Sequence, residues 1–271
     1  MIRIPIRVGD SRYDALVGSG LLDSLGHHAV DVARGRRCAV IADTNTAALF
    51  SETLLRSLHT ADFTAFLITV PAGESSKSLQ QVGVVCDEMA AGGLDRSSFL
   101  VALGGGVVGD LAGFAAAIYH RGVPHIQVPT TLLAQVDSSI GGKTAINTIG
   151  GKNLLGAIHQ PALVVADLDT LASLPDREFR QGFAEIIKHA IVADPAMFDL
   201  LKAAQATSLQ SRQNTSWKVA LQDLVHRNMK IKASIVAQDE RDLSGPRAIL
   251  NFGHTIGHAI ERAGGYSQFL H

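Results

Sequence analysis

The chain has 271 residues, of which 46% are hydrophobic, 18% charged and 5% aromatic, and its formal net charge is −1. This length is sufficient for two domains of ordinary size with a substantial core. The composition excludes a disordered protein, and no apolar run is long enough for a membrane span. The near-neutral charge without basic runs excludes an electrostatic surface for nucleic acid.

The amino-terminal stretch MIRIPIRVGD alternates in the manner of a β-strand. It lacks the apolar stretch and the small-residue cleavage site of a signal peptide. Cys38 and Cys86 lie in apolar or helical surroundings, which is typical of reduced core thiols. We therefore expect a soluble, cytoplasmic protein.

Residues 1–172 are predicted to form an α/β domain. Five apolar, β-branched runs are expected to be strands, and stretches of helical period lie between most of them. This pattern is typical of a parallel, Rossmann-like sheet that is covered on both faces. The expected strands span residues 36–43, 63–70, 98–104, 123–129 and 162–167.

Residues 173–271 are predicted to form a helical domain, because the pattern changes after Pro175. Long segments of helical period follow, with no convincing strand between them. The expected helices span residues 176–192, 195–208, 215–237 and 254–263. The domain boundary is expected near residues 168–176.

A glycine-rich turn joins a strand to a helix in SFLVALGGGVVGDLAGFAAA. Glycines let the backbone approach a ligand closely, and the N–H groups at a helix start point at a phosphate placed there. Gly104, Gly106 and Gly109 satisfy GxGxxG, a weak signal by itself, and no acidic residue is obvious about 20 positions later. Asp43, at the carboxyl end of an earlier strand, suits ribose hydroxyls instead. The segment predicts a nucleotide pyrophosphate site or, alternatively, a tight turn without a ligand.

Further polar residues are expected at the same edge of the sheet. Glu74 and Lys77 lie in PAGESSKS, where helix capping is the alternative explanation. Lys143 and Lys152 stand beside glycines, a position also typical of solvated turns. The same group of segments contains Thr130, Thr131, Asp137, Asn147 and Asn153. Together these side chains indicate a site for a phosphorylated, hydroxylated substrate.

The segment RAILNFGHTIGHAIE sets Arg247, Asn251, His254 and His258 at spacings of four, three and four. On one helix these residues would share a face, where they could hold a metal and an anionic substrate together. From spacing alone, His254 and His258 are predicted to bind a metal as a pair. Capped and solvated histidines are the alternative.

Several long motifs, in this order, resemble the dehydroquinate synthase family of sugar phosphate cyclases across essentially the whole chain. The matching stretches are GGGVVGDLAGF, RGVPHIQVPTTLLAQVDSSIGGKTAIN, GKNLLGAIHQP, LPDREFRQGFAEIIKHA, IKASIVAQDE and LNFGHTIGHAIE. The resemblance implies an N-terminal dinucleotide-binding domain, a C-terminal helical domain and a cleft between them.

The resemblance also implies the reaction and its cofactors. 3-Deoxy-D-arabino-heptulosonate 7-phosphate would be converted to 3-dehydroquinate and phosphate with the help of NAD and a divalent metal, zinc or cobalt. The steps are transient oxidation by NAD, elimination of phosphate, re-reduction and an intramolecular aldol closure, so the net change is not redox. The implied partners are this small sugar phosphate and a second copy of the chain in a homodimer.

By resemblance, the metal ligands are Glu185, His254 and His271, which makes His258 a substrate-side residue rather than a ligand. The residues implied for NAD are Asp43, Asn45, Glu74, Lys77, Gly105, Gly106, Asp110, Thr130, Thr131, Lys143, Lys152, Thr170 and Ser173. Ser173 stands where a Thr is more usual. The residues implied for substrate binding and catalysis are Asp137, Lys143, Lys152, Asn153, Lys188, Lys232, Arg247, Asn251, His258 and Arg121, the last reaching the phosphate across a dimer.

Three alternatives stay open at this point. One is a sister cyclase that acts on sedoheptulose 7-phosphate or forms deoxy-inosose, and another is a metal-dependent alcohol or glycerol dehydrogenase. The third is a non-catalytic NAD-binding or assembly module, since the chain stops at His271 whereas family members continue. For these 271 residues alone, we expect reduced stability and weak or absent activity.

Overall fold

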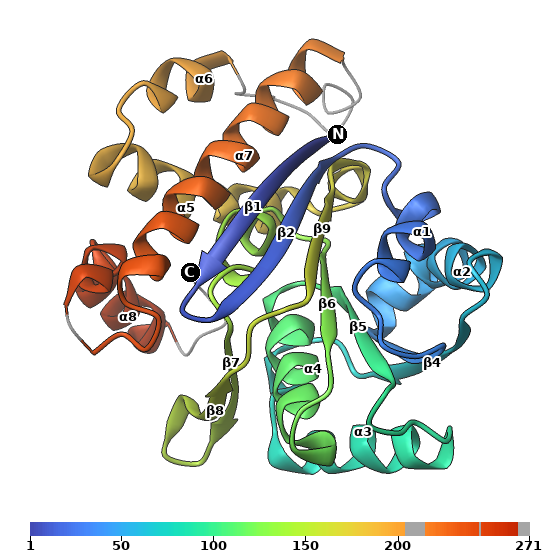
Figure 1. Ribbon diagram of the computed structural model, residues 1–271. Helices are drawn as coiled ribbons and strands as arrows, with labels where there is room; N and C mark the ends of the chain where they lie inside the picture. Colours follow the sequence, from blue (N-terminus) through green and yellow to red (C-terminus); the bar gives the residue numbers. More distant parts are fainter. Residues whose placement is uncertain (204–214, 244, 265–271) are drawn as a thin grey trace.

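The computed structural model describes residues 1–203, 215–243 and 245–264. Figure 1 shows a central sheet with helices on both sides and a group of helices at one end. The strands are β1 (Ile2–Val8), β2 (Ser11–Gly18), β3 (Arg37–Asp43), β4 (Thr64–Val70), β5 (Phe99–Gly104), β6 (His125–Pro129), β7 (Lys143–Thr148), β8 (Gly151–Ile158) and β9 (Leu163–Asp167). The α-helices are α1 (Leu25–Val30), α2 (Thr44–Thr60), α3 (Leu79–Ala91), α4 (Gly106–Ile118), α5 (Asp176–Val192), α6 (Met197–Ala203), α7 (Thr215–Gln238) and α8 (His254–Ala263).

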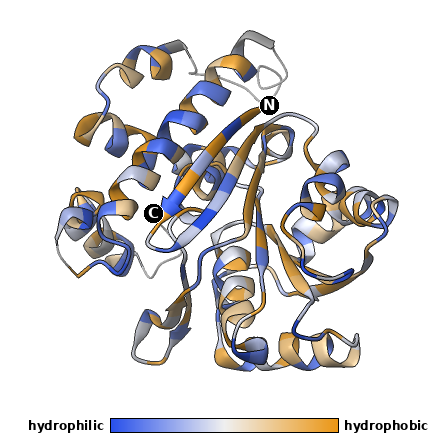
Figure 2. Cartoon of the chain, viewed as in Figure 1, coloured by the Kyte–Doolittle hydropathy of each residue, from blue (hydrophilic) through white to orange (hydrophobic). Residues whose placement is uncertain are grey.

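The main sheet has seven strands in the order β1-β2-β9-β6-β5-β3-β4. All neighbouring strands run parallel except β1 and β2, which form an antiparallel pair at one edge. The five strands predicted from apolar runs are β3, β4, β5, β6 and β9, and they are orange along most of their length in Figure 2. The predicted α/β class is therefore confirmed, with an antiparallel edge added.

The helical segments also lie where the sequence places them. α5 and α8 match their predicted bounds, and α7 extends one residue further, to Gln238. The helix predicted over 195–208 is α6, and its last predicted residues fall outside the described part of the chain. None of the described helices is long and apolar enough to cross a membrane.

Three apolar clusters form the core. One lies between α1, α2 and the sheet, and a second lies on the opposite face under α3 and α4. The third joins β1 and β2 to the helical end, where Ile4, Ile6 and Val8 share a cluster with Leu221 and Val225 of α7. The amino-terminal hairpin therefore packs against helices from beyond the predicted domain boundary.

A close contact between α5 and the segment after β6 fixes the position of the residues that follow each of them. A Cβ atom at Gly182 would lie 2.5 Å from Cγ of Leu132 and 2.8 Å from the backbone nitrogen of Leu133. Only glycine permits this approach. It brings Glu185, one turn further along α5, towards Asp137 in the neighbouring π-helical turn Ala134–Ser138.

The variant Gly182→Ala is expected to lower the free energy of unfolding by about 1–3 kcal/mol, because the added methyl group overpacks this contact. The matched control is Gly83→Ala in α3, where an added Cβ meets nothing within 4 Å. Gly83→Ala should leave the free energy of unfolding unchanged or raise it by up to about 1 kcal/mol, because Ala has a higher helix propensity than Gly. Urea unfolding measures both; equal effects of the two substitutions would contradict the close contact.

Candidate active site

The order of the strands creates a crevice at the carboxyl ends of β3 and β5. From β3 the chain continues to β4 on one side, whereas β5 pairs with β3 on the other side. In open α/β sheets, ligands bind outside the carboxyl ends of the strands at such a switch point. Asp43 ends β3 and Gly104 ends β5, so the two segments predicted to bind a nucleotide lie together at this place.

The glycine turn after β5 has the geometry that the sequence predicts. A Cβ at Gly105 would lie 3.0 Å from Cγ2 of Thr131, and a Cβ at Gly109 would lie 2.8 Å from Oε1 of Gln127. Gln127 Nε2 also donates to the backbone oxygen of Gly109 at 3.1 Å. The turn is thus closely packed, and helix α4 begins at its end with Gly106.

The remaining residues predicted for a nucleotide lie at the same edge of the sheet. Asp43 caps α2, since its Oδ1 accepts from the N–H groups of Asn45 and Thr46, each at 2.9 Å. One oxygen of the Asp43 carboxylate is therefore used to cap the helix rather than to bind a ligand. Thr130 and Thr131 directly follow β6, and the turn after β9 carries Thr170 and Ser173.

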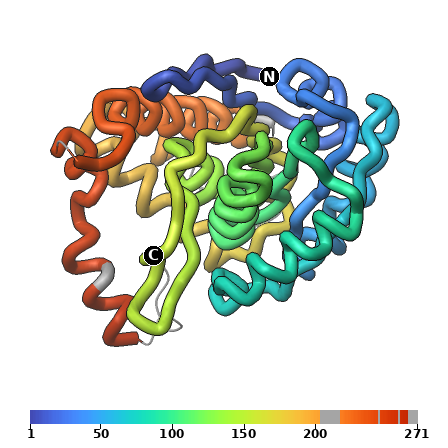
Figure 3. Tube along the Cα trace, turned by 60° about the horizontal axis from the view of Figure 1, so that its bottom comes forward, coloured from blue at the N-terminus to red at the C-terminus, as the bar shows by residue number. Residues whose placement is uncertain are grey.

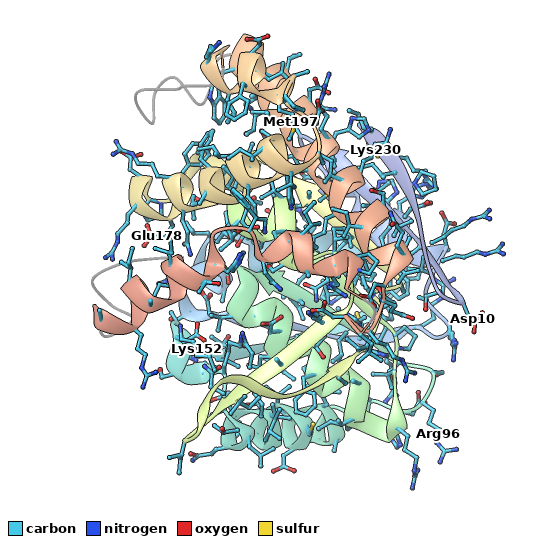
Figure 4. All side chains as sticks on the ribbon, turned by 90° about the vertical axis from the view of Figure 1, so that its left-hand side faces the viewer. Asp10, Arg96, Lys152, Glu178, Met197 and Lys230 are labelled. Atoms are coloured by element: carbon cyan, nitrogen blue, oxygen red, sulfur yellow. The ribbon has the colours of Figure 1, made fainter. Side chains whose placement is uncertain are left out.

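Lys77 occupies a buried position between this edge and the β7–β8 hairpin. Its Nζ lies 2.6 Å from Oδ2 of Asp110 and 2.5 Å from Oδ1 of Asn153. Burial raises the pKa of Asp110, against the opposing effect of the Lys77 ammonium. On the more exposed side of the same region, Lys152 Nζ lies 3.9 Å from Oε1 of Glu74. In Figure 4 the labelled Lys152 lies toward the end of the hairpin.

A buried ion pair joins the π-helical turn to α7. Lys232 Nζ lies 2.8 Å from Oδ1 of Asp137 and 2.6 Å from its backbone oxygen. Burial alone would raise the pKa of Asp137, but Lys232 and Lys188 together hold it well below its usual range. Burial lowers the pKa of Lys232, although Asp137 opposes that shift. A π-helical turn is a frequent feature of functional sites.

A second buried pair lies within α5, where Lys188 donates to Oε2 of Glu185. The other carboxylate oxygen of Glu185, Oε1, faces His254, whose Nε2 lies 3.9 Å away. The structure thus brings together two residues that the sequence assigns to a metal. Their proposed companion, His271, lies outside the described residues, and so does the side chain of His258.

His189 belongs to the same cluster and was missed by the sequence analysis. Ligand atoms of Asp137, Glu185 and His189 all lie within 4.8 Å of one another. The signal that could have found it is the spacing of four from Glu185, which places both side chains on one face of a helix.

The hydrogen bonds of Asn228 determine which nitrogen of His189 carries the proton. Asn228 Nδ2 donates to the backbone oxygen of Leu224 at 2.7 Å, so its Oδ1 faces Nδ1 of His189 at 2.8 Å. Nδ1 is therefore the donor, and Nε2 carries a lone pair. That Nε2 is buried without a hydrogen-bond partner in the described structure. Burial is also the main cause that lowers the pKa of His189.

These residues fit a divalent metal. Carboxylate oxygens and neutral imidazole nitrogens are ligands that zinc prefers. The buried lone pair of His189 and the approach of Glu185 Oε1 to His254 Nε2 both suit such an ion. Lys188 holds Oε2 of Glu185 and Lys232 holds Oδ1 of Asp137, so an ion would share these carboxylates with the lysines.

The prediction that Arg247, Asn251, His254 and His258 share one face of a single helix is wrong. Arg247 and Asn251 lie on a 3-10 helix, Pro246–Asn251, whereas His254 begins α8. Gly253 separates the two with a φ of 83°, a left-handed conformation that ends the first helix. Arg247 is nevertheless buried, and its Nη1 donates to the backbone oxygen of Glu240 at 2.7 Å. Asn251 is exposed.

Two other predicted residues lie apart from the cluster. Lys143 is exposed and pairs with Asp242 at 2.7 Å. Arg121 lies in the connection between α4 and β6, at the amino end of β6. Because α4 begins at the glycine turn and has 13 residues, Arg121 is about 20 Å from that turn along the helix. It therefore does not join this site within one chain.

Comparison with solved structures identifies the class of the fold. 2-Epi-5-epi-valiolone synthase from Streptomyces hygroscopicus, solved with NAD+ and Zn2+, is 31% identical with a TM-score of 0.85, covering 97% of this chain and 71% of that one. 2-Deoxy-scyllo-inosose synthase, complexed with carbaglucose-6-phosphate, NAD+ and Co2+, is 27% identical with a TM-score of 0.83 and the same coverage of both chains. The protein thus has the fold of the sugar phosphate cyclases. Glycerol dehydrogenase from Schizosaccharomyces pombe, 16% identical with a TM-score of 0.60 over 81% of this chain and 59% of that one, shares the fold alone.

Sequence comparison narrows the class to one family. The family models described as 3-dehydroquinate synthase N-terminal and C-terminal match residues 67–181 and 182–271. The 3-dehydroquinate synthase of Caulobacter vibrioides is 50% identical over 100% of this chain and 72% of its own length. That of Pelobacter propionicus is 47% identical over 99% of this chain and 73% of its own. The chain belongs to the 3-dehydroquinate synthase family.

The variant Lys232→Met is expected to lower the free energy of unfolding by about 1–3 kcal/mol, because it leaves the partly buried Asp137 carboxylate without its closest partner. The double variant Asp137→Asn, Lys232→Met removes both charges and should recover most of that loss. Urea unfolding of the two variants and the parent chain tests the pair. Equal losses in the single and the double variant would show that the buried charge is not the cause.

Proposed function

We propose that the chain catalyses the reaction of its family, the conversion of 3-deoxy-D-arabino-heptulosonate 7-phosphate to 3-dehydroquinate and phosphate. The observation that carries this proposal is the group of buried Glu185, Lys188 and Lys232 with the partly buried Asp137, within the same fold as the glycine turn at the switch point. A nucleotide crevice combined with buried cations suits a cofactor-dependent reaction of an anionic sugar.

For NAD we propose the residues at the carboxyl edge of the sheet and in the adjoining loop. They are Asp43, Asn45, Glu74, Lys77, Gly105, Gly106, Asp110, Thr130, Thr131, Lys143, Lys152, Thr170 and Ser173. The place of the glycine turn and of Asp43 at the switch point of the sheet supports this assignment. When bound, NAD supplies a hydride acceptor that is regenerated in the same cycle.

For the metal we propose Glu185, His254 and His271 as ligands. The approach of Glu185 Oε1 to His254 Nε2 supports the first two. A divalent ion there supplies Lewis acidity to a substrate hydroxyl. Lys188 holds the other oxygen of Glu185 and thereby orients the carboxylate, a role that groups behind the ligands often have in metal sites.

For the substrate we propose polar and charged side chains from the cluster, the hairpin and the segment that leads into α8: Asp137, Lys143, Lys152, Asn153, Lys188, Lys232, Arg247, Asn251 and His258. Arg247 distinguishes this substrate from those of the sister cyclases, which lack a carboxylate. It is buried, and no carboxylate of the described residues lies within salt-bridge distance of it. A guanidinium in that position favours a carboxylate-bearing substrate, because it binds carboxylates through two parallel hydrogen bonds.

We further propose a cytoplasmic homodimer. Arg121 lies at the opposite edge of the sheet from Thr130 and can reach a substrate phosphate only in the site of another copy. The outer edge of β8 supports a self-association surface nearby, since it is unpaired in the described structure and exposes Leu154 and Leu155. An exposed apolar strand edge is usually covered in a native assembly.

The direct test is an assay of phosphate release from 3-deoxy-D-arabino-heptulosonate 7-phosphate with NAD and added Zn2+ or Co2+, with net NADH followed in the same tube. Phosphate release without NADH is expected. Faster turnover of sedoheptulose 7-phosphate would favour a sister cyclase, and net NADH from a simple alcohol would favour a dehydrogenase. NAD binding without metal retention or phosphate release would support the non-catalytic alternative.

The variant Glu185→Gln is expected to weaken retention of Zn2+ or Co2+ by at least about 100-fold, since it removes an ionised ligand. Metal content after dialysis against a graded chelator measures this loss without relying on activity. The matched control is Glu88→Gln, a change at an exposed acid on α3. Metal retention that is unchanged in Glu185→Gln would contradict the proposed ligand set.

A further inference from the structure

Asn147 stands at an irregularity in the β7–β8 hairpin. The strands pair regularly from Lys143 with Ile158 up to Ile146 with Leu155, and the next pair is Thr148 with Gly151. Asn147 is therefore set against residues 152–154 in a bulge. Bulges next to active sites commonly redirect a side chain. Here the backbone N–H of Asn147 leaves the ladder and donates to the backbone oxygen of Lys77 at 2.8 Å.

The side chain of Asn147 uses both ends of its carboxamide. Its Nδ2 donates to Oε1 of Glu74 at 2.8 Å, and its Oδ1 accepts from the backbone N–H of Asn153 at 2.9 Å. A carboxylate only accepts and a backbone N–H only donates, so the amide has one orientation that satisfies both. No hydrophobic residue and no single charged residue could replace these two bonds.

Asn153 depends on this contact for its conformation. Its φ is 56°, a left-handed value that costs energy for residues other than glycine, although Asn tolerates it better than most. The bond from its N–H to Asn147 holds the backbone in this conformation. Asn153 Oδ1 then accepts from the buried ammonium of Lys77. Asn147 thus contacts Glu74, Lys77 and Asn153 directly.

The hairpin is attached to the body of the molecule through β7 and through a small number of polar contacts. It is a separate two-stranded sheet, and residues along β8 are mostly exposed. It projects from the body of the molecule in Figure 1 and lies beside α4 in Figure 3, in agreement with the contacts of β7 to that helix. Lys143 also pairs with Asp242, and Lys152 with Glu74. Isolated two-stranded hairpins are only marginally stable in water, so the orientation of this one depends on α4, on these pairs and on the bonds of Asn147.

We propose that Asn147 is a positioning residue that couples the cofactor loop, residues 73–78, to the substrate hairpin, residues 143–158. This inference rests on the proposed function, which assigns Glu74 and Lys77 to NAD and Lys152 and Asn153 to the substrate. NAD that orders the cofactor loop also orders the hairpin through Asn147. By linkage, the substrate on the hairpin strengthens NAD binding by the same factor.

Hydrogen exchange of the hairpin amides, with and without NAD, tests the coupling. In the parent chain NAD is expected to slow exchange across residues 143–158 by about 5-fold or more, the lower end of ordinary coupling. In Asn147→Ala, NAD should still bind, with its Kd changed by less than about 3-fold, but should slow exchange in the hairpin clearly less than in the parent chain, because only the Lys77 and Lys152 contacts still join the loop to the hairpin. The control Thr148→Ala removes a bond within the hairpin turn, from Gly150 N–H to Thr148 Oγ1, and should keep the effect of NAD.

Exchanging the donor and the acceptor between Asn147 and Glu74 tests whether their hydrogen bond, rather than the fold of the hairpin alone, transmits the effect of NAD. Asn147→Asp keeps the acceptor for Asn153 but sets a carboxylate against Glu74, so the effect of NAD should fall as it does in Asn147→Ala. The double variant Glu74→Gln, Asn147→Asp restores the hydrogen bond with donor and acceptor exchanged, and at a concentration of NAD that saturates this variant the full effect should return. NAD binding that leaves hairpin exchange unchanged in the parent chain, or slowing of the same size in Asn147→Ala, overturns the coupling alone. Failure of the parent chain to bind NAD overturns the proposed cofactor role and the coupling with it.

Discussion

Two carboxylates, one buried and one partly buried, are each held by a buried lysine, and the candidate site depends on these pairs. Asp137 and Lys232 join the π-helical turn to α7, and Lys188 fixes one oxygen of Glu185 on α5. Buried charges are tolerated only when they are paired and hydrogen-bonded. The close contact at Gly182 brings the two carboxylates near each other. The packing of α5 against the π-helical turn therefore requires that each carboxylate is paired with a lysine.

These pairs and contacts join the helical part of the chain to the sheet. The amino-terminal strands β1 and β2 share a core with α7, which carries Lys232, while the sheet positions the glycine turn and the cofactor loop. Lys77 and Asn147 then connect that loop to the hairpin. The site is therefore assembled from segments far apart in the sequence, which are attached to one another by apolar packing and by polar contacts.

Much of the fold could be predicted from the sequence, because apolar runs and helical periods are strong local signals. The strands β7 and β8 were missed since their glycines, lysines and asparagines are typical of a loop, and a mostly exposed hairpin needs no apolar alternation. The interpretation of Arg247 to His258 as one helical stripe was wrong because Gly253 adopts a left-handed conformation between two helices, which the spacing of the polar residues does not reveal. The bulge at Asn147 and the role of His189 depend on contacts between distant segments, which no local pattern reveals.

We propose that Glu185 and His254 hold a divalent metal beside the buried cations Lys188 and Lys232. A crystal structure of the chain with Co2+, using anomalous scattering at the cobalt edge, would locate that ion. We expect one strong peak within bonding distance of Glu185 Oε1 and His254 Nε2, with Lys188 still on the other oxygen of Glu185. A peak between Asp137 and His189 with Lys232 displaced, or a peak away from Glu185, would contradict it.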